Sequence, residues 1–299
     1  MPHMPVNNLA MWHIFHPRKT MIGQLSVHEF NDPFLRIHVI TSPETGGAEG
    51  VNSTIIETQK KLIIVDTALF YNIASEIKEY AQSLGKEIAK VVITHDHPDH
   101  WFGSYAYKGN PIYALKDVIS KIENLAPGIL KLKRTQLAPE ELPPEVELPT
   151  QELKPGIEVI DGVTFDWKVA TDVEYELGLF LVLPDHKVMV AADLLYNNSH
   201  LFLGERLKDK KPSAASWLSY LKTLDKDNFK GIVPGHGMPG DASIIDFCIG
   251  YLEAMVPVIN QPGMTSSLYK EKALELFPDA KLESMLELSG FFLFDFTSL

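Results

Sequence analysis

The densest group of metal-binding side chains in the chain lies in the stretch THDHPDH, which holds three histidines and two aspartates directly after an apolar run. In extended backbone, residues two apart point the same way, so His95 and His97 can hold one ion. Asp99 and His100, beyond the bend at the proline, then face a second ion. Zinc and iron both accept imidazole and carboxylate ligands. The alternative is a polar loop that only solvates a strand end, but four candidate ligand side chains at this spacing favour a metal site.

Two later strand ends supply further candidate ligands. The run KVMVAAD ends at Asp193, and GIVPGHG places His236 between two glycines. A carboxylate buried without a partner is costly, and a metal ion would satisfy it. The glycines allow the backbone to come close to the site. Each residue alone is weak evidence, because aspartates at strand ends are common, but together they point to the same site as THDHPDH.

Apolar patterning indicates the elements that position these residues. We expect a hairpin from VNSTIIET and KLIIVDTA, a helix that ends at Gly85, and a strand at KVVITH. The order of strands with interspersed helices occurs twice, which indicates two similar α/β halves in a single domain, residues 1–299, with a core over about residues 20–240. A proline-rich lid or insertion is expected at residues 127–156. A helical extension is expected at residues 241–299, where it either walls the cleft or mediates a homodimer.

Composition restricts the partners of the protein. The net charge is −12, with 39 acidic and 27 basic residues, which disfavours nucleic acid and anionic lipid. We expect a small-molecule substrate, no nucleic-acid partner and no membrane partner. The opening lacks the features of a leader peptide, so we expect a cytoplasmic protein, with a removed leader as the alternative. Cys248 is the only cysteine, which excludes an internal disulfide and indicates a buried, inert thiol.

The motifs THDHPDH, VAAD and VPGHG resemble, in order, those of the metallo-β-lactamase superfamily over about residues 50 to 240. The resemblance implies an α/β (α+β) fold, a four-layer αββα sandwich with C-terminal helices. It also implies two divalent metal ions, zinc first and iron or manganese as alternatives. The residues implied as ligands are His95 and His97 on one ion, Asp99, His100 and His236 on the other, and Asp193 between them. Asp66 in IIVDT resembles the first motif of the family, where an acid supports the ligands through hydrogen bonds.

The sequence departs from the family at one ligand. The family normally places a further histidine after a strand, but the equivalent stretch, WKVATDVEYELGLFLVLP, contains none. Counting back from the strand GLFLVLP puts Asp172 at that place, with Glu174, Glu176 or solvent as alternatives. An anionic ligand lowers the net charge of the ions and their pull on bound water, and a hard oxygen ligand admits iron or manganese. Branches that resemble alkylsulfatases carry an acid here, whereas a typical lactamase or glyoxalase-type thioesterase does not.

The resemblance implies a metallo-hydrolase. A water between two ions would be deprotonated near neutral pH and attack the substrate, and Asp99 would act as the catalytic group that orients this water and moves its proton. We expect the substrate to be an ester, lactone, amide or thioester. One alternative is a sulfatase- or phosphodiesterase-like hydrolase, and another is a non-catalytic metal-binding module.

Three residues beside the ligands are candidates for substrate contacts. Trp101 follows the THDHPDH motif directly, and Tyr196 and His200 follow Asp193 closely. Each also has a structural alternative, since aromatic residues beside a strand end are often part of the core. The sequence does not tell these roles apart.

Overall fold

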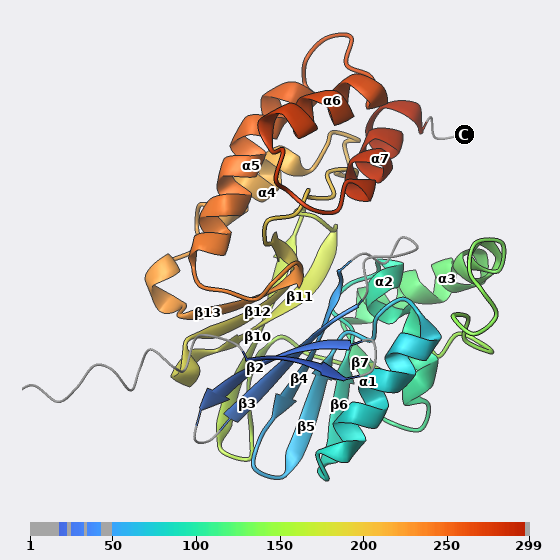
Figure 1. Ribbon diagram of the computed structural model, residues 1–299, viewed down its shortest axis with the longest axis vertical. Coiled ribbons are helices and arrows are strands. Elements are labelled where there is room, and N and C mark those ends of the chain that lie inside the picture. The colour runs from blue at the N-terminus through green and yellow to red at the C-terminus, as the bar shows by residue number, and fades with distance from the viewer. Residues whose placement is uncertain (1–17, 23–24, 33–34, 43–49, 297–299) are drawn as a thin grey trace, which may run out of the picture.

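Two β-sheets packed face to face form the centre of the protein in this computed structural model (Figure 1). The structure describes residues 18–22, 25–32, 35–42 and 50–296. The opening residues 1–17, on which the expectation about a leader peptide depends, lie outside this part of the chain.

The first sheet has eight described strands in sequence order. Its strands are β1 (Arg18–Ile22), β2 (Leu25–Asp32), β3 (Leu35–Thr41), β4 (Asn52–Glu57), β5 (Lys61–Val65), β6 (Glu87–Val92), β7 (Ile112–Ala114) and β8 (Gln151–Glu152). Pairing is antiparallel from β1 to β5 and parallel from β5 to β8. The sheet is therefore mixed, and it contains the hairpin expected from VNSTIIET and KLIIVDTA.

The second sheet has five described strands in the order β13-β12-β11-β10-β9. Their bounds are β9 (Gly156–Ile160), β10 (Val163–Thr171), β11 (Leu177–Leu183), β12 (Val188–Tyr196) and β13 (Gly231–His236). Only the β12–β13 pair is parallel among these described strands.

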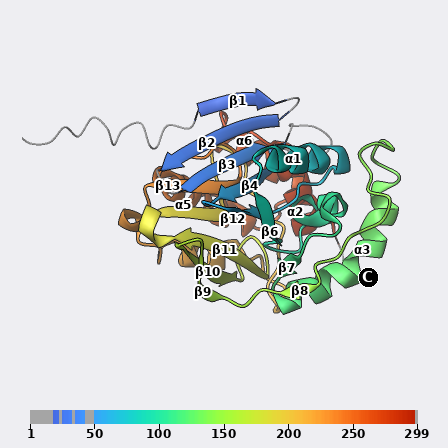
Figure 2. The same cartoon turned by 90° about the horizontal axis from the view of Figure 1, so that it is seen from below.

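Helices cover the outer face of each sheet. Helices α1 (Tyr71–Ser83), α2 (Pro98–Trp101) and α3 (Lys116–Lys133) lie on the side of the first sheet, and Figure 2 shows α3 along its β7 and β8 edge. Helices α4 (Ala214–Leu221), α5 (Ser243–Ile259), α6 (Ser266–Leu276) and α7 (Ser284–Gly290) lie on the side of the second sheet. These four layers confirm the αββα sandwich, and no described helix has the length and apolar character needed to span a bilayer.

Strand β11 shows why an uninterrupted apolar run forms the middle of such a sandwich. Successive side chains of a strand point to opposite faces of the sheet. Leu179, Leu181 and Leu183 accordingly join the core between the two sheets, whereas Phe180 and Val182 join the core beneath the C-terminal helices. Both faces of β11 are buried, which explains why its sequence does not alternate with polar residues.

The segment expected as one irregular excursion, residues 127–156, is partly regular. Helix α3 continues through Pro127 and ends at Lys133. Pro127 has no backbone N–H to donate, but it is exposed, so water can solvate the carbonyl that loses its bond. Residues 134–150 contain no helix or strand, and Leu142 and Leu148 in this segment pack against the first core. They are therefore part of the wall of the domain.

We predict that Leu181→Ala lowers the free energy of unfolding by about 2–5 kcal/mol, because it opens a cavity between the sheets. Urea unfolding followed by circular dichroism measures the change. The matched control is Leu276→Ala, since Leu276 is 46% exposed and its truncation should cost less than about 0.5 kcal/mol. Equal losses in the two variants would contradict this account of the core.

Candidate metal centre

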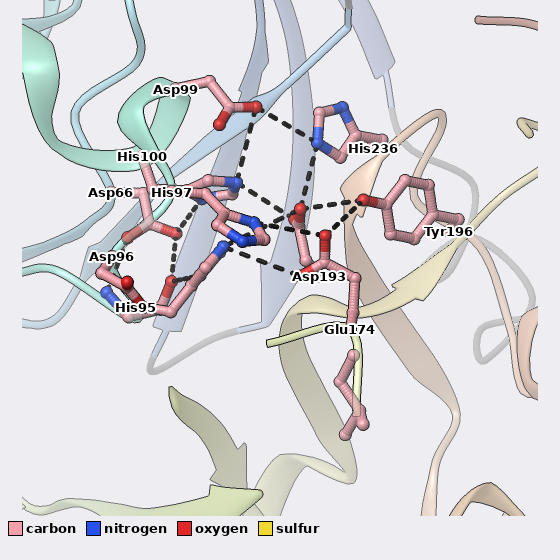
Figure 3. Close-up of polar contacts among 12 residues, drawn as sticks. Asp66, His95, Asp96, His97, Asp99, His100, Glu174, Asp193, Tyr196 and His236 are labelled. Carbon is pink, nitrogen blue, oxygen red and sulfur yellow. Dashed lines mark hydrogen bonds and ion pairs between the residues drawn. The ribbon is translucent and has the colours of Figure 1, made fainter. Parts of the chain in front are cut away.

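The candidate ligands meet at one edge of the two sheets (Figure 3). Two groups of histidine and acidic side chains have all their ligand atoms within 4.8 Å of one another: His95, His97, Glu174 and Asp193 in the first group, and Asp99, His100 and His236 in the second. These side chains come from the loop after β6, the short helix α2, the turn between β10 and β11, and strands β12 and β13. Each group therefore forms only when segments that are distant in the sequence come together in the folded chain.

The first group has the spacing of ligands around an ion. His97 Nδ1 lies 3.2 Å from Glu174 Oε1. His95 Nε2 lies 3.9 Å from Glu174 Oε2 and 3.9 Å from Asp193 Oδ2. Zinc binds nitrogen and oxygen at about 2.0–2.2 Å, so two ligand atoms of a tetrahedral site are roughly 3–4 Å apart.

Asp193 connects the two groups. Its Oδ1 lies 3.1 Å from His100 Nε2, and its Oδ2 lies 3.2 Å from His236 Nε2. Asp99 Oδ2 lies 3.4 Å from His236 Nε2 and 3.8 Å from His100 Nε2. A carboxylate between both groups is the arrangement expected for a bridging ligand.

Buried atoms that lack hydrogen bonds show that the donor set fits metal ions. His95 Nε2, His100 Nε2, Glu174 Oε2 and Asp193 Oδ1 are buried and make no hydrogen bond with another described residue. Buried polar atoms without a partner are rare, because leaving one unsatisfied costs about 1–3 kcal/mol. Coordination to divalent ions would satisfy these nitrogen and oxygen atoms together.

Asp66 orients two of the imidazoles. Its Oδ2 accepts hydrogen bonds from His100 Nδ1 at 2.8 Å and from Thr94 Oγ1 at 2.9 Å, and its Oδ1 accepts from Thr94 N at 2.8 Å. Because the Thr94 hydroxyl donates to Asp66, its oxygen accepts from His95 Nδ1, 2.9 Å away. Both histidines therefore carry a proton on Nδ1 and turn Nε2 toward the cluster, where Nε2 would bind a metal ion once any proton on it is lost. This geometry agrees with the supporting role expected for Asp66.

Glycines allow β13 to approach the cluster. A Cβ atom at Gly235 would lie 1.8 Å from Asp193 Oδ1, and one at Gly237 would lie 2.1 Å from the Asn197 carbonyl oxygen. Gly237 also has φ of 86°, which L side chains rarely adopt. The two glycines around His236 therefore have the close backbone approach that the sequence indicated.

The structure corrects the expected identity of the extra acidic ligand. Asp172 does not belong to either group, and Glu174 takes the place expected for it. Backbone hydrogen bonds from Asp172 N to Glu176 O and from Val173 N to Tyr175 O close a tight turn with Glu174 at its tip. Asp172 lines a separate cavity, and Glu176 pairs with Lys121 at 2.7 Å. The longer side chain of Glu174 reaches the cluster from the turn.

Burial and mutual charge shift the pKa values of the cluster strongly. Burial raises the pKa of Glu174 to about 7, although His97 opposes this shift. Burial alone would lower the pKa values of His97 and His236, but Glu174 beside His97 and Asp193 beside His236 raise both to about 10. Burial would raise the pKa of Asp193, but His100 and His236 lower it well below its usual value. Without metal, the cluster therefore holds protons on histidines.

A cavity of about 320 Å³ opens above the cluster. Tyr196 lines it, and its hydroxyl lies 3.0 Å from Asp193 Oδ2 and 3.2 Å from Glu174 Oε1, so its single proton is shared between the two carboxylates. Trp101 and His200, the other two residues expected to contact substrate, are not among its lining residues. Trp101 is buried in the first core and its indole donates to Asp96 O, while the His200 ring contacts the hydroxyl of Tyr251.

The sequence analysis expected the extension at residues 241–299 to wall the cleft or mediate a homodimer, but it did not name the individual apolar and basic residues that line this cavity. They are Ile129, Leu132 and Lys133 at the end of α3, Phe202 after β12, and Met285, Leu288 and Phe292 near the C-terminus. The segment expected to form a lid contributes only through the end of α3, because no residue of 134–150 lines the cavity. Apolar residues at helical spacing, at 285, 288 and 292 and at 129 and 132, were the available signals for a buried or ligand-binding helix face.

A family model described as "Metallo-beta-lactamase superfamily" matches residues 46–236. The chain belongs to the metallo-beta-lactamase superfamily. As a metallo-hydrolase of this superfamily, it brings the candidate ligands together at the edge where the two sheets meet. A search of curated proteins gave no match.

Solved structures of metallo-beta-lactamases share the fold at low sequence identity. The structure of TMB-1 is 19% identical, with a TM-score of 0.54 over 78% of this chain and 98% of that chain. The DIM-1 metallo-beta-lactamase exposed to ceftazidime is 16% identical, with a TM-score of 0.54 over 78% of this chain and 99% of its own. The metallo-beta-lactamase from Pontibacter korlensis is 20% identical, with a TM-score of 0.55 over 80% of this chain and 100% of that chain. These similarities concern the fold.

We predict that Asp66→Asn weakens zinc binding by about 10–100-fold, because the amide cannot accept all the hydrogen bonds that orient His95 and His100. Competition with a chromogenic zinc chelator measures the dissociation constant. Asp96→Asn is the matched control, because Asp96 lies in the same motif but outside both ligand groups. Unchanged affinity in Asp66→Asn would show that these hydrogen bonds do not support the site.

We further predict that zinc binding at pH 8 releases at least two protons per protein. His97 and His236 have pKa values of about 10 in the metal-free cluster. Burial would lower the pKa of His100, but Asp193 and Asp66 raise it well above its usual value. The ions must displace the protons on these histidines. Calorimetry in two buffers with different ionisation enthalpies measures the number released. His97→Ala should release about one proton fewer, and binding without proton release would contradict the pKa values.

Proposed function

We propose that the protein hydrolyses an ester, lactone, amide or thioester of a small molecule at a dinuclear zinc centre. The observation that supports this most directly is Asp193, whose two oxygens face His100 and His236 and whose Oδ2 also approaches His95. Two ions held on either side of one carboxylate would lower the pKa of a water molecule to near neutral and polarise the bond under attack. Iron or manganese in place of zinc is the alternative, since Glu174 adds a hard oxygen ligand.

Asp99 is the residue best placed to handle the proton of the attacking water. Its carboxylate contacts His236 and His100, its side chain is 16% exposed, and it lines the cavity. Burial would raise the pKa of Asp99, but His100 and His236 lower it. At neutral pH the group is therefore a carboxylate, the form that accepts a proton.

Tyr196 holds the two acidic ligands in place. Its hydroxyl is within hydrogen-bond distance of both Asp193 and Glu174 and shares its one proton between them, and burial raises its pKa well above the usual value. The phenol consequently stays protonated and remains a donor. It keeps Glu174 at the tip of its turn in contact with the rest of the cluster.

A sulfatase- or phosphodiesterase-like hydrolase is the second candidate function, and Lys133 favours it. Lys133 lines the cavity but forms no ion pair with another described residue. An ammonium group at the mouth of the site would attract an anionic substrate. Sulfate release from alkyl and aryl sulfates, compared with hydrolysis of the corresponding esters, separates the two candidates.

We predict that Glu174→Gln lowers kcat/KM at least about 100-fold on the best substrate, because loss of a ligand charge should exceed the 10–100-fold effect of losing an outer partner. A screen of chromogenic esters, lactones, thioesters, sulfates and phosphodiesters, with zinc analysis of each sample, gives the measurement. Asp172→Asn is the matched control and should keep wild-type activity. An inactive Asp172 variant together with an active Glu174 variant would overturn the assignment of Glu174 as the acidic ligand. If neither the wild type nor any variant turns over a substrate, the result would support a non-catalytic module.

A further inference from the structure

One apolar wall of the cavity is made by a segment outside the region that matches the family model. The match ends at His236, whereas Met285, Leu288 and Phe292 lie in α7 and in the π-helical turn Phe291–Asp295 that follows it. Figure 1 shows α7 at the end of the stack of C-terminal helices, on the same side of the molecule as α2 and α3. The reacting cluster and the wall opposite it therefore come from different parts of the chain.

The helical spacing of the wall residues explains why they face the cavity together. Met285, Leu288 and Phe292 are three and four residues apart, which places them on one helix face. On the other side of the cavity, Ile129 and Leu132 of α3 are also three residues apart. Two apolar helix faces consequently border the same space.

An aromatic path joins this wall to the metal cluster. The ring of Phe202 meets the ring of His97 at 5.5 Å and the ring of Phe292 at 6.0 Å, both in edge-on geometry. An apolar group that enters between α3 and α7 would therefore meet Phe292 and then Phe202 before it reaches His97, a candidate metal ligand.

Apolar side chains at the mouth of the cavity are partly exposed to solvent. Leu132 is 49% exposed and Leu288 is 46% exposed, although both line the cavity. Exposed apolar surface next to a site is typical of a binding groove, since a ligand that covers it is stabilised by removal of that surface from water. Continuity with the cluster identifies the occupant as the substrate of that cluster.

We propose that the substrate carries an apolar chain that lies between α3 and α7 while its reacting group faces the metal cluster. This inference rests on the proposed function, because it assigns the substrate class of the same site. Leu288 and Phe292 act as specificity-determining residues, and they affect binding of the chain without contacting the reacting atoms.

Binding of alkanohydroxamates to the zinc-loaded protein tests the proposal without measuring turnover. The hydroxamate head binds zinc, so the alkyl chain must extend into the cavity. Affinity measured by calorimetry should increase about fourfold per methylene, or roughly 250-fold from butanohydroxamate to octanohydroxamate, as expected for burial of each methylene. Leu288→Ser should weaken octanohydroxamate about fivefold or more and leave butanohydroxamate unchanged.

Leu276→Ser is the matched control, because Leu276 has the same 46% exposure on α6 but does not line the cavity. It should retain the chain-length dependence of the wild type. If zinc is bound and butanohydroxamate binds, but octanohydroxamate binds no more tightly, the inference is wrong and the proposed function stands. If Leu288→Ser keeps the full dependence, the assignment of the chain to α7 is wrong. If the protein binds neither zinc nor any hydroxamate, the proposed metal centre itself fails.

Discussion

The carboxylate of Asp66 is the contact on which the geometry of the candidate metal centre depends. It accepts from His100 directly and from Thr94, whose hydroxyl in turn accepts from His95. One buried acid thereby sets the tautomers of two imidazoles in different ligand groups. Asp66 itself has φ of 62°, an uncommon conformation for a residue other than glycine. A hydrogen bond from its backbone N–H to Val92 O, and one from Thr94 N to its Oδ1, hold it there.

The rest of the cluster balances charges that would be costly if buried separately. Asp193 and Glu174 lie beside histidines, and the Tyr196 hydroxyl shares its proton between them. Removing one partner from such a network leaves another charge buried and unpaired, which is more costly than the loss of an exposed pair. The same balance explains why protons occupy the histidines in the absence of metal and why metal and proton compete for these atoms.

Much of the fold and of the candidate site could be predicted from the sequence, because the residues that carry them follow simple patterns. The ligands of THDHPDH, Asp193 and His236 follow apolar strands, and strand ends at one sheet edge converge. Glu174 was the second choice, because the hydrogen bonds that put it at the tip of the turn depend on backbone conformation at Asp172. The positions of Trp101 and His200 were not predictable either, since orientation toward the core or the cavity is decided by packing between distant segments.

The wall formed by α7 lies far along the chain from every candidate metal ligand, the last of which is His236. Chemistry and selectivity are thus encoded in separate stretches of sequence, and exposed wall positions such as Leu288 tolerate change without disturbing the buried centre. Exchange of the last helices between related chains would therefore be a simple route, in evolution or in the laboratory, to a changed substrate preference with the same reaction.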